Sequence, residues 1–269
     1  IYMGDWSSDV CSSDLDPRFP AEIQFADEEQ SWNYEIGTKN TFFNGMLMAN
    51  LALYYIDWSD QQISASYSFS TGGTQSYITN AGETEIKGVE LELEAALTDN
   101  FTAGFTYSYT DAKFVKLFDA EAQQLFGDPS LAGKQLPGVP QQQASIYGKY
   151  SFPIGEAYNG FVRADTSFTD RKYDQIYQLA HTGEQILTNI SFGFEADRWS
   201  ASLFVNNVTD DRTPSMVTRY LDQLNLNVPQ YPNADPAQNN VAGSTATERG
   251  FYFPLASKRQ IGLTASYRF

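Results

Sequence analysis

Alternation of apolar and polar residues with a period of two is the feature that most constrains this sequence. Between Phe101 and Thr110, aromatic residues and alanine occupy the odd-numbered positions, and glycine, serine and threonine occupy the even-numbered ones. Successive side chains of a β-strand point to opposite faces, whereas a helix would mix the two sets around its circumference. The segment is therefore predicted to be a strand with one apolar and one small-polar face.

The same pattern recurs along the chain and predicts nine strands. Several of them approach the ~9–11 residues with which a tilted strand crosses a bilayer. Phe204 is an exception to the pattern, because it falls on the polar side of its segment. The nine predicted strands are Trp32–Lys39, Leu47–Tyr55, Val89–Leu97, Phe101–Thr110, Ala144–Phe152, Phe161–Thr169, Ile186–Glu195, Ala201–Asn206 and Ile261–Phe269.

The connections between these strands alternate between short and long. Asn-Gly and Asp-Asn pairs in the short connections tolerate the positive φ that tight hairpins require. The short turns are Phe43–Gly45, Thr98–Asn100, Pro153–Asn159 and Asp197–Arg198, and the long links are Ser70–Gln75, Lys116–Pro140, Lys172–Glu184 and Thr209–Ser257. Short turns at one end and long loops at the other are typical of an outer-membrane barrel, so we predict an all-β, antiparallel transmembrane β-barrel.

A soluble or surface-attached β-sandwich, such as a carbohydrate-binding module, is the alternative that the alternation leaves open. A sandwich packs one face of each sheet on a core and places charged, long side chains on the other face. In this sequence the polar positions are often glycine, serine or threonine, which better suits the crowded or water-filled interior of a barrel. Aromatic residues near the strand ends match the interfacial girdles of membrane barrels.

Composition excludes several other classes of protein. The formal net charge is −16, and so acidic a surface would repel the phosphates of a nucleic acid. A single cysteine supports neither a disulfide scaffold nor a thiolate zinc site. No run approaches the ~20 apolar residues of a transmembrane helix.

The first fifteen residues, Ile1–Leu15, have neither strand nor helical periodicity and lack the features of a signal peptide. The segment resembles the conceptual translation of a sequencing-library adapter, and we interpret it as a non-native artefact. Residues 16–269 are then the native part, with 17 basic and 30 acidic residues and a net charge of −13. Cys11, the single cysteine, would belong to the artefact.

Several motifs of the native part resemble the carboxy-terminal portion of TonB-dependent outer-membrane receptors. The most specific is Asn80–Glu83 leading into Lys87–Glu92. Phe269 ends a predicted strand with aromatic or apolar residues two and four positions before it, similar to the assembly signal of bacterial outer-membrane proteins. The other matching segments are Trp32–Lys39, Leu53–Trp58, Leu136–Pro140 and Phe204–Arg212.

The resemblance implies a fold, a location and partners. The family's barrels have 22 strands, so about nine strands would be the last part of a larger barrel in the bacterial outer membrane, surrounded by lipid. Such receptors import a scarce siderophore-, cobalamin- or oligosaccharide-like solute. TonB supplies the energy through the amino-terminal box and plug, which we expect in an upstream region missing from this chain. No bond of the solute is broken, so we expect neither an enzyme nor a cofactor.

Catalytic and metal sites are not predicted. His181 is the only histidine and lacks any ordered nucleophile motif around it. Glu90, Glu92 and Glu94 share one strand face, where they could act as paired carboxylates or bind calcium; we favour a wetted wall balanced by Lys149, Arg163 or Arg268.

Ligand contacts are expected in the long loops, where tyrosine and histidine rings can stack and asparagine amides can donate hydrogen bonds. That combination suits sugars and aromatic chelators alike. The candidate residues are Tyr173, Tyr177, His181, Tyr220, Tyr231, Asn239 and Asn240.

Overall fold

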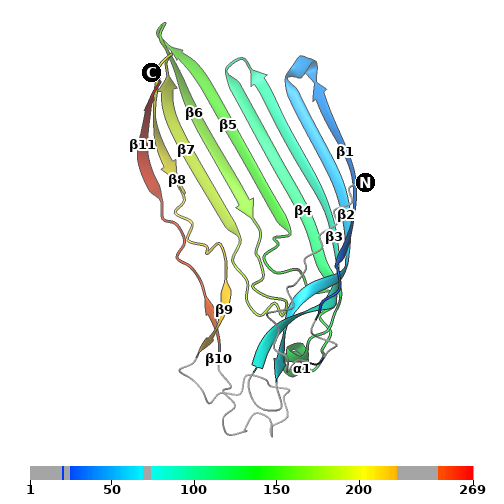
Figure 1. Ribbon diagram of the computed structural model, residues 1–269. Helices are drawn as coiled ribbons and strands as arrows, with labels where there is room; N and C mark the ends of the chain where they lie inside the picture. The colour runs from blue at the N-terminus through cyan, green and yellow to red at the C-terminus, as the bar shows by residue number, and fades with distance from the viewer. Residues whose placement is uncertain (1–19, 21–24, 69–73, 223–247, 269) are drawn as a thin grey trace.

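The computed structural model describes residue 20 and residues 25–68, 74–222 and 248–268. Its main feature is one antiparallel sheet of nine strands in the order β1-β2-β3-β4-β5-β6-β7-β8-β11 (Figure 1). The sheet is open, with β1 and β11 at its edges. Its strands are β1 (Gln30–Phe42), β2 (Leu47–Ser68), β3 (Thr74–Thr98), β4 (Phe101–Leu117), β5 (Gln142–Ile154), β6 (Tyr158–Thr169), β7 (Gln185–Glu195), β8 (Trp199–Asn206) and β11 (Gln260–Tyr267).

All nine predicted strands are confirmed, and each pairs with its neighbour along the meander. Two of them are much longer than the alternation indicates, because β2 and β3 continue as a two-stranded extension. Ser59 is the last residue of β2 that pairs with β1, whereas the pairing with β3 runs on to Ser68 and Thr74.

Three elements lie within the long links. The hairpin of β9 (Thr218–Asp222) and β10 (Glu248–Tyr252) lies in the last link, and α1 (Ala120–Phe126) follows β4. The side chain of Asp119 caps α1 by accepting a hydrogen bond from the Ala122 N–H, and Gly127 ends the helix with a left-handed φ of 76°. No helix in the described part of the chain is long and apolar enough to cross a membrane.

The tight connections gather at one end of the sheet and the long ones at the other (Figure 1). At the short-turn end, the 3-10 turn η3 (Phe43–Gly45) joins β1 to β2, and Asn44 has a φ of 54° there. Gly155 has a φ of 64° between β5 and β6. Such left-handed residues reverse the chain within a few positions, and glycine and asparagine adopt them at least cost. β11 also ends at the short-turn end (Figure 1).

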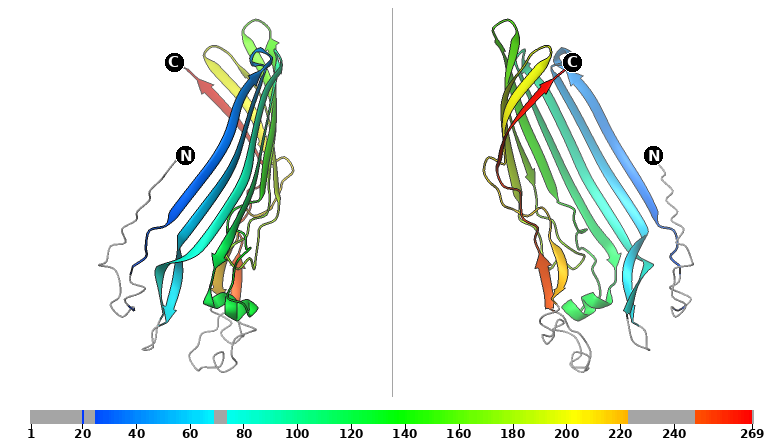
Figure 2. Two further views of the ribbon diagram at one scale, coloured as in Figure 1. Left: turned by 90° about the vertical axis from the view of Figure 1, so that its right-hand side faces the viewer. Right: turned by 60° about the vertical axis from the view of Figure 1, so that its left-hand side comes forward.

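The sheet is a single curved layer (Figure 2). Its two faces carry different side chains. Its apolar face carries rows such as Leu51, Leu91, Tyr107, Ala144 and Phe168, which lie opposite one another on successive strands. This face is open: Ile146 is 57% exposed and Phe192 is 49% exposed.

A β-sandwich would bury such a face beneath a second sheet. Within the described ranges the only other sheet is the two-stranded pair of β9 and β10. The sandwich alternative therefore does not fit the structure, whereas an apolar face turned toward lipid does.

Candidate functional site

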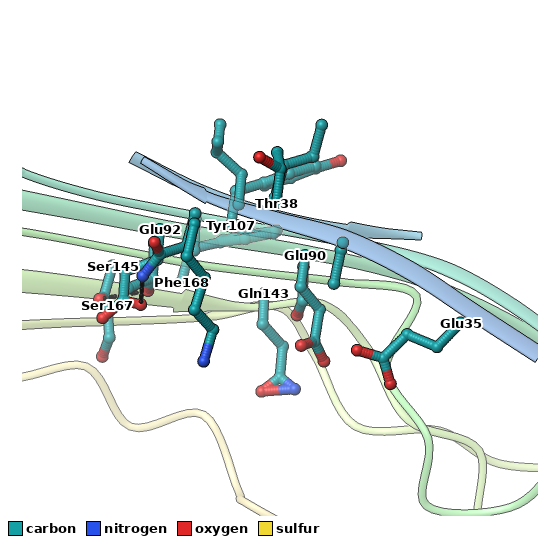
Figure 3. A pocket seen from close by; sticks show the side chains of 18 of the residues that line it. Glu35, Thr38, Glu90, Glu92, Tyr107, Gln143, Ser145, Ser167 and Phe168 are labelled. Atoms are coloured by element: carbon teal, nitrogen blue, oxygen red, sulfur yellow. Dashed lines mark hydrogen bonds between the residues drawn. The ribbon is translucent and has the colours of Figure 1, made fainter. Parts of the chain in front are cut away.

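The polar face of the sheet is the first part of the candidate site. It carries rows such as Asn50, Glu92, Thr106, Ser145 and Ser167, which are register partners on β2 to β6. Four carboxylates of this face lie on β1 and β3: Glu35, Glu90, Glu92 and Glu94. Figure 3 shows Glu35, Glu90 and Gln143 pointing to the same side of the sheet.

Part of the polar face is hollowed into an open trough of about 880 Å³ that extends across β1 to β6. Small residues of four strands give it its depth, including Gly37, Ala52, Ser145 and Ser167. Asn50 Nδ2 donates a 2.9 Å hydrogen bond to Glu92 Oε2 on its wall. The described lining contains no histidine or cysteine. Its carboxylates, amides and hydroxyls can form hydrogen bonds with water or with polar groups of a solute.

A chain of polar contacts crosses the same face from β3 to β7. The Tyr147 hydroxyl donates to Glu94 Oε1 at 3.2 Å, and the Arg163 guanidinium lies 4.4 Å from the centre of the Tyr147 ring. Arg163 Nε is 3.5 Å from Asp165 Oδ1, and Asp165 Oδ2 accepts a 2.8 Å hydrogen bond from Asn189 Nδ2. Arg163 is thus paired with Asp165 of its own strand, and the balancing of Glu90, Glu92 and Glu94 by basic residues stays a prediction.

Lys149 lies directly opposite Arg163 on the neighbouring strand. Its ammonium is 5.1 Å from the centre of the Phe161 ring, a cation–π contact. Lys149 and Arg163 therefore lie on the same polar face as the carboxylates of β1 and β3.

The second part of the candidate site is a loop core at the long-loop end, where two connections pack on each other. Its buried members are Phe114, Leu117, Ala122, Leu131 and Tyr177. They come from the end of β4, from α1 and the loop after it, and from the connection between β6 and β7. The two connections therefore form one packed unit, because each buries apolar side chains supplied by the other.

Tyr177 is a member of this loop core rather than a surface residue. It is 7% exposed, and its hydroxyl donates a 2.9 Å hydrogen bond to Asp119 Oδ1, the carboxylate that caps α1. Tyr177 therefore packs inside the loop core, in the same connection that carries Tyr173 and His181.

Tyr173 and His181 are brought together by the β6–β7 connection. Their rings meet edge to face with centroids 5.8 Å apart, and their backbones form an isolated antiparallel bridge. Thr182 O lies 2.7 Å from His181 Nδ1, which fixes the direction of the imidazole ring.

A loop hollow of about 350 Å³ lies beside Tyr173. Pro137 comes to it from the β4–β5 connection, Lys172 from the β6–β7 connection, and Met216 and Arg219 from the chain that follows β8. Sequence reasoning missed these four residues, because they lie on three links that only the folded sheet brings side by side.

The other candidates are spread over the last link. Tyr220 lies in β9, where its backbone pairs with Gly250 of β10. Tyr231, Asn239 and Asn240 lie outside the described residues, as does the segment Ile1–Leu15. A ligand role for any of the seven candidates stays a prediction.

Comparison with known proteins identifies the family. The family model for the TonB-dependent receptor-like β-barrel matches residues 12–208. The probable TonB-dependent siderophore receptor PiuA of Acinetobacter baumannii is 27% identical over 199 residues, which are 71% of this chain and 24% of PiuA. The metal-pseudopaline receptor CntO of Pseudomonas aeruginosa is 25% identical over 192 residues, covering 69% of this chain and 24% of CntO.

Solved structures show the same fold. The crystal structure of PiuA superposes with a TM-score of 0.63 at 18% identity, covering 92% of this chain and 29% of PiuA. The ferric yersiniabactin uptake receptor FyuA of Yersinia pestis superposes with a TM-score of 0.61 at 18% identity, covering 90% of this chain and 30% of FyuA. The chain thus spans about a quarter to a third of the length of these proteins. It belongs to the TonB-dependent receptor family, and its sheet is part of the family's β-barrel.

Proposed function

We propose that this chain forms part of the wall and loops of an outer-membrane receptor that imports a metal chelate with energy supplied through TonB. The observation that carries the proposal is the two-faced sheet, apolar on the open face and polar on the other, with packed loops at one end only. A barrel wall in lipid requires this combination, because its outer face meets acyl chains and its inner face meets water or protein.

The layout of outer-membrane barrels then orients the sheet. Short turns face the periplasm and long loops face the outside. The loop core, Tyr173 and His181 would lie outside, and the short-turn end would lie at the periplasmic surface. The acidic and basic residues of the polar face would line the interior.

The substrate class is narrowed by the relatives. PiuA is described as a siderophore receptor and CntO as a receptor for a metal–pseudopaline complex. These relatives support the choice of a metal chelate among the siderophore-, cobalamin- and oligosaccharide-like solutes that the resemblance implies.

Tyr173 and His181 are the described residues best placed to touch such a chelate, because the Tyr173 ring borders the loop hollow and His181 contacts that ring. Aromatic rings stack on flat chelating groups, and Lys172 and Arg219 in the same hollow suit the negative charge that many chelates carry. Tyr220, Tyr231, Asn239 and Asn240 are proposed to contribute from the last link, and Tyr177 to act by holding the loop core.

The import step requires no bond cleavage in the solute. The chain's own contribution would be to exclude lipid, to present the loop hollow to the outside and to line the path with polar groups. TonB would act on a part of the receptor outside this chain.

An uptake assay on the complete receptor tests the proposal. Cells that express it would be given ⁵⁵Fe complexes of catecholate, hydroxamate and mixed siderophores, with and without TonB. We expect TonB-dependent accumulation of at least one complex, and weaker accumulation in the Tyr173→Ala/His181→Ala double variant. Leu179→Ala, an exposed position of the same connection, is the matched control. Recovery of the receptor in the soluble periplasm, or uptake that ignores TonB, would contradict the proposal.

A further inference from the structure

Several hydrogen bonds from side chains to backbone groups hold the chain where it leaves β8. Asn207 is 5% exposed and has a φ of 53°, a left-handed conformation that asparagine tolerates. Its Oδ1 accepts a 2.8 Å hydrogen bond from the Asp211 N–H, and its Nδ2 donates to Asp211 O at 2.9 Å. The amide thus closes a local loop between residues 207 and 211.

The same amide also reaches the chain that returns to the sheet. Asn207 Nδ2 donates a second hydrogen bond, 3.0 Å long, to Ser257 O, which is fifty residues further along the chain. Both N–H groups of the amide and its oxygen are therefore used, so the buried side chain is fully satisfied. Aspartate has no donors to replace these bonds, and alanine would leave buried backbone groups unpaired.

Asp210 makes a second, independent link between the leaving and returning chain. Its Oδ1 accepts a 2.8 Å hydrogen bond from the Arg259 N–H, immediately before β11. Its Oδ2 lies 2.8 Å from Arg212 Nη2, which holds the carboxylate from the other side. Two side chains thus join the start of the link to its end.

The leaving chain is also fixed to β7. Asp211 Oδ2 accepts from the Ile186 N–H at 2.8 Å, and the Val208 N–H donates to Thr188 O at 2.8 Å. Gln185 Nε2 donates to Thr213 O at 3.0 Å. Met216 and Arg219, which line the loop hollow together with Tyr173, follow this fixed segment within a few residues.

We propose that Asn207 and Asp210 are positioning residues that clamp the neck of the last link and so set the shape of the loop hollow. The neck is defined as residues 207–213 and 257–260. The clamp itself stands on the contacts above, whereas its importance for ligand binding rests on the proposed function.

Distance measurements between spin labels test the clamp in the complete receptor, in a background free of other cysteines. One label would replace Leu255, which is fully exposed on the returning chain, and the other would replace exposed Asp99 in the turn between β3 and β4. We expect a single narrow distance distribution in the parent. Asn207→Gly, which keeps the left-handed backbone but removes the amide, should broaden it clearly.

Conservative variants separate positioning from general damage. Asp210→Ala removes the acceptor for Arg259 and should broaden the distribution. Asp210→Asn keeps an acceptor oxygen for the Arg259 N–H but loses the charge that pairs with Arg212, so it should broaden the distribution less than Asp210→Ala does. Asn206→Ala, at the exposed neighbouring position, is the matched control and should leave the distribution unchanged. A parent-like distribution in Asn207→Gly would overturn the proposal.

Amide hydrogen exchange gives an independent measurement in case a variant folds poorly. In Asn207→Gly the Asp211 amide should exchange about tenfold faster or more, since it loses its acceptor, while amides in the middle of β8 keep their protection. Equal acceleration throughout β8 would mean general unfolding and would overturn the positioning role. If no chelate is taken up but the spin-label distance distributions change as expected, the proposed function is contradicted and the clamp is supported.

Discussion

The ring of Tyr54 lies flat across Gly88, its register partner on the neighbouring strand. A Cβ atom at Gly88 would be 2.1 Å from Cζ of the tyrosine, so only glycine leaves room for the ring. The Tyr54 hydroxyl passes over β3 and shares a 2.8 Å hydrogen bond with Thr110 Oγ1 on β4. Two further pairs repeat the arrangement on the polar face: Tyr147 over Gly104, and Phe204 over Gly262.

Gly88→Ala is expected to destabilise the sheet by about 1–3 kcal/mol, because the added methyl displaces the Tyr54 ring and breaks its hydrogen bond. Denaturant unfolding of the complete receptor in detergent measures the loss. Gly148→Ala is the control, since a Cβ there meets Phe101 only at 3.3 Å. In Tyr54→Ala/Gly88→Ala the clash disappears, so the two losses should be clearly less than additive. Additive losses would show that the ring does not depend on the glycine.

Tyr177 and Tyr173 are expected to respond differently to substitution. Tyr177→Phe removes the hydrogen bond to Asp119 and should cost about 1 kcal/mol, measured as faster amide exchange in α1 and its flanking loop. Tyr173→Ala should leave that exchange unchanged, because Tyr173 is not a member of the loop core. Equal effects of the two variants would contradict the division into a packing and a surface tyrosine.

Three consecutive positions of β7 test which face meets lipid. Spin labels at Ile190 and Phe192, on the apolar face, should be relaxed preferentially by oxygen, which concentrates in acyl chains. A label at Ser191, on the polar face, should be relaxed preferentially by a water-soluble nickel chelate. This period-two pattern should hold for the complete receptor in lipid vesicles, and identical accessibility at all three positions would contradict a membrane wall.

The neck of the last link is expected to loosen at acid pH. The hydrogen bond from Arg212, followed by that from the Arg259 N–H, lowers the pKa of Asp210. Because the pKa is lower in the folded state, the stabilisation is fully present above the ordinary carboxylate value of about 3.9 and disappears as pH falls through the folded value.

Burial raises the pKa of Asp211, but hydrogen bonds from Thr213 and the Ile186 N–H outweigh it and hold the pKa below its usual value. Both carboxylates therefore act in the same direction. The distance distribution between labels at Leu255 and Asp99 should stay narrow from pH 7 to about 5 and broaden toward pH 3. Asp210→Asn should reduce this pH dependence, and an unchanged profile in that variant would rule out Asp210 as its source.

Much of the strand architecture follows from local sequence. A strand exposes alternate side chains to two environments, so residues such as Phe105 and Thr106 report the two faces without any knowledge of the neighbours. Tight turns are equally local, because Asn44 and Gly45 carry their conformational preference themselves. This is why all nine strands, their order and the end with short turns could be predicted.

The candidate site could be predicted only in part. Tyr173 and His181 lie eight residues apart and meet within one connection, so a search of that loop could find them together. Tyr177 belongs to the same stretch, yet its burial depends on Leu117 and Leu131 from another connection. Phe204, an irregularity in the alternation, is explained by Gly262, which lies 58 positions away and directly opposite.

The sequence by itself thus determined the period of two, the strands, the turns and the resemblance to a receptor barrel, because each depends on residues close together in the chain. Only the tertiary structure decided which loops pack together, where aromatic rings cross glycines and how Asn207 joins Asp211 to Ser257. The physical reason is that hydrogen bonding and packing between distant segments depend on strand register and loop closure. Neither leaves a periodic signal in the sequence.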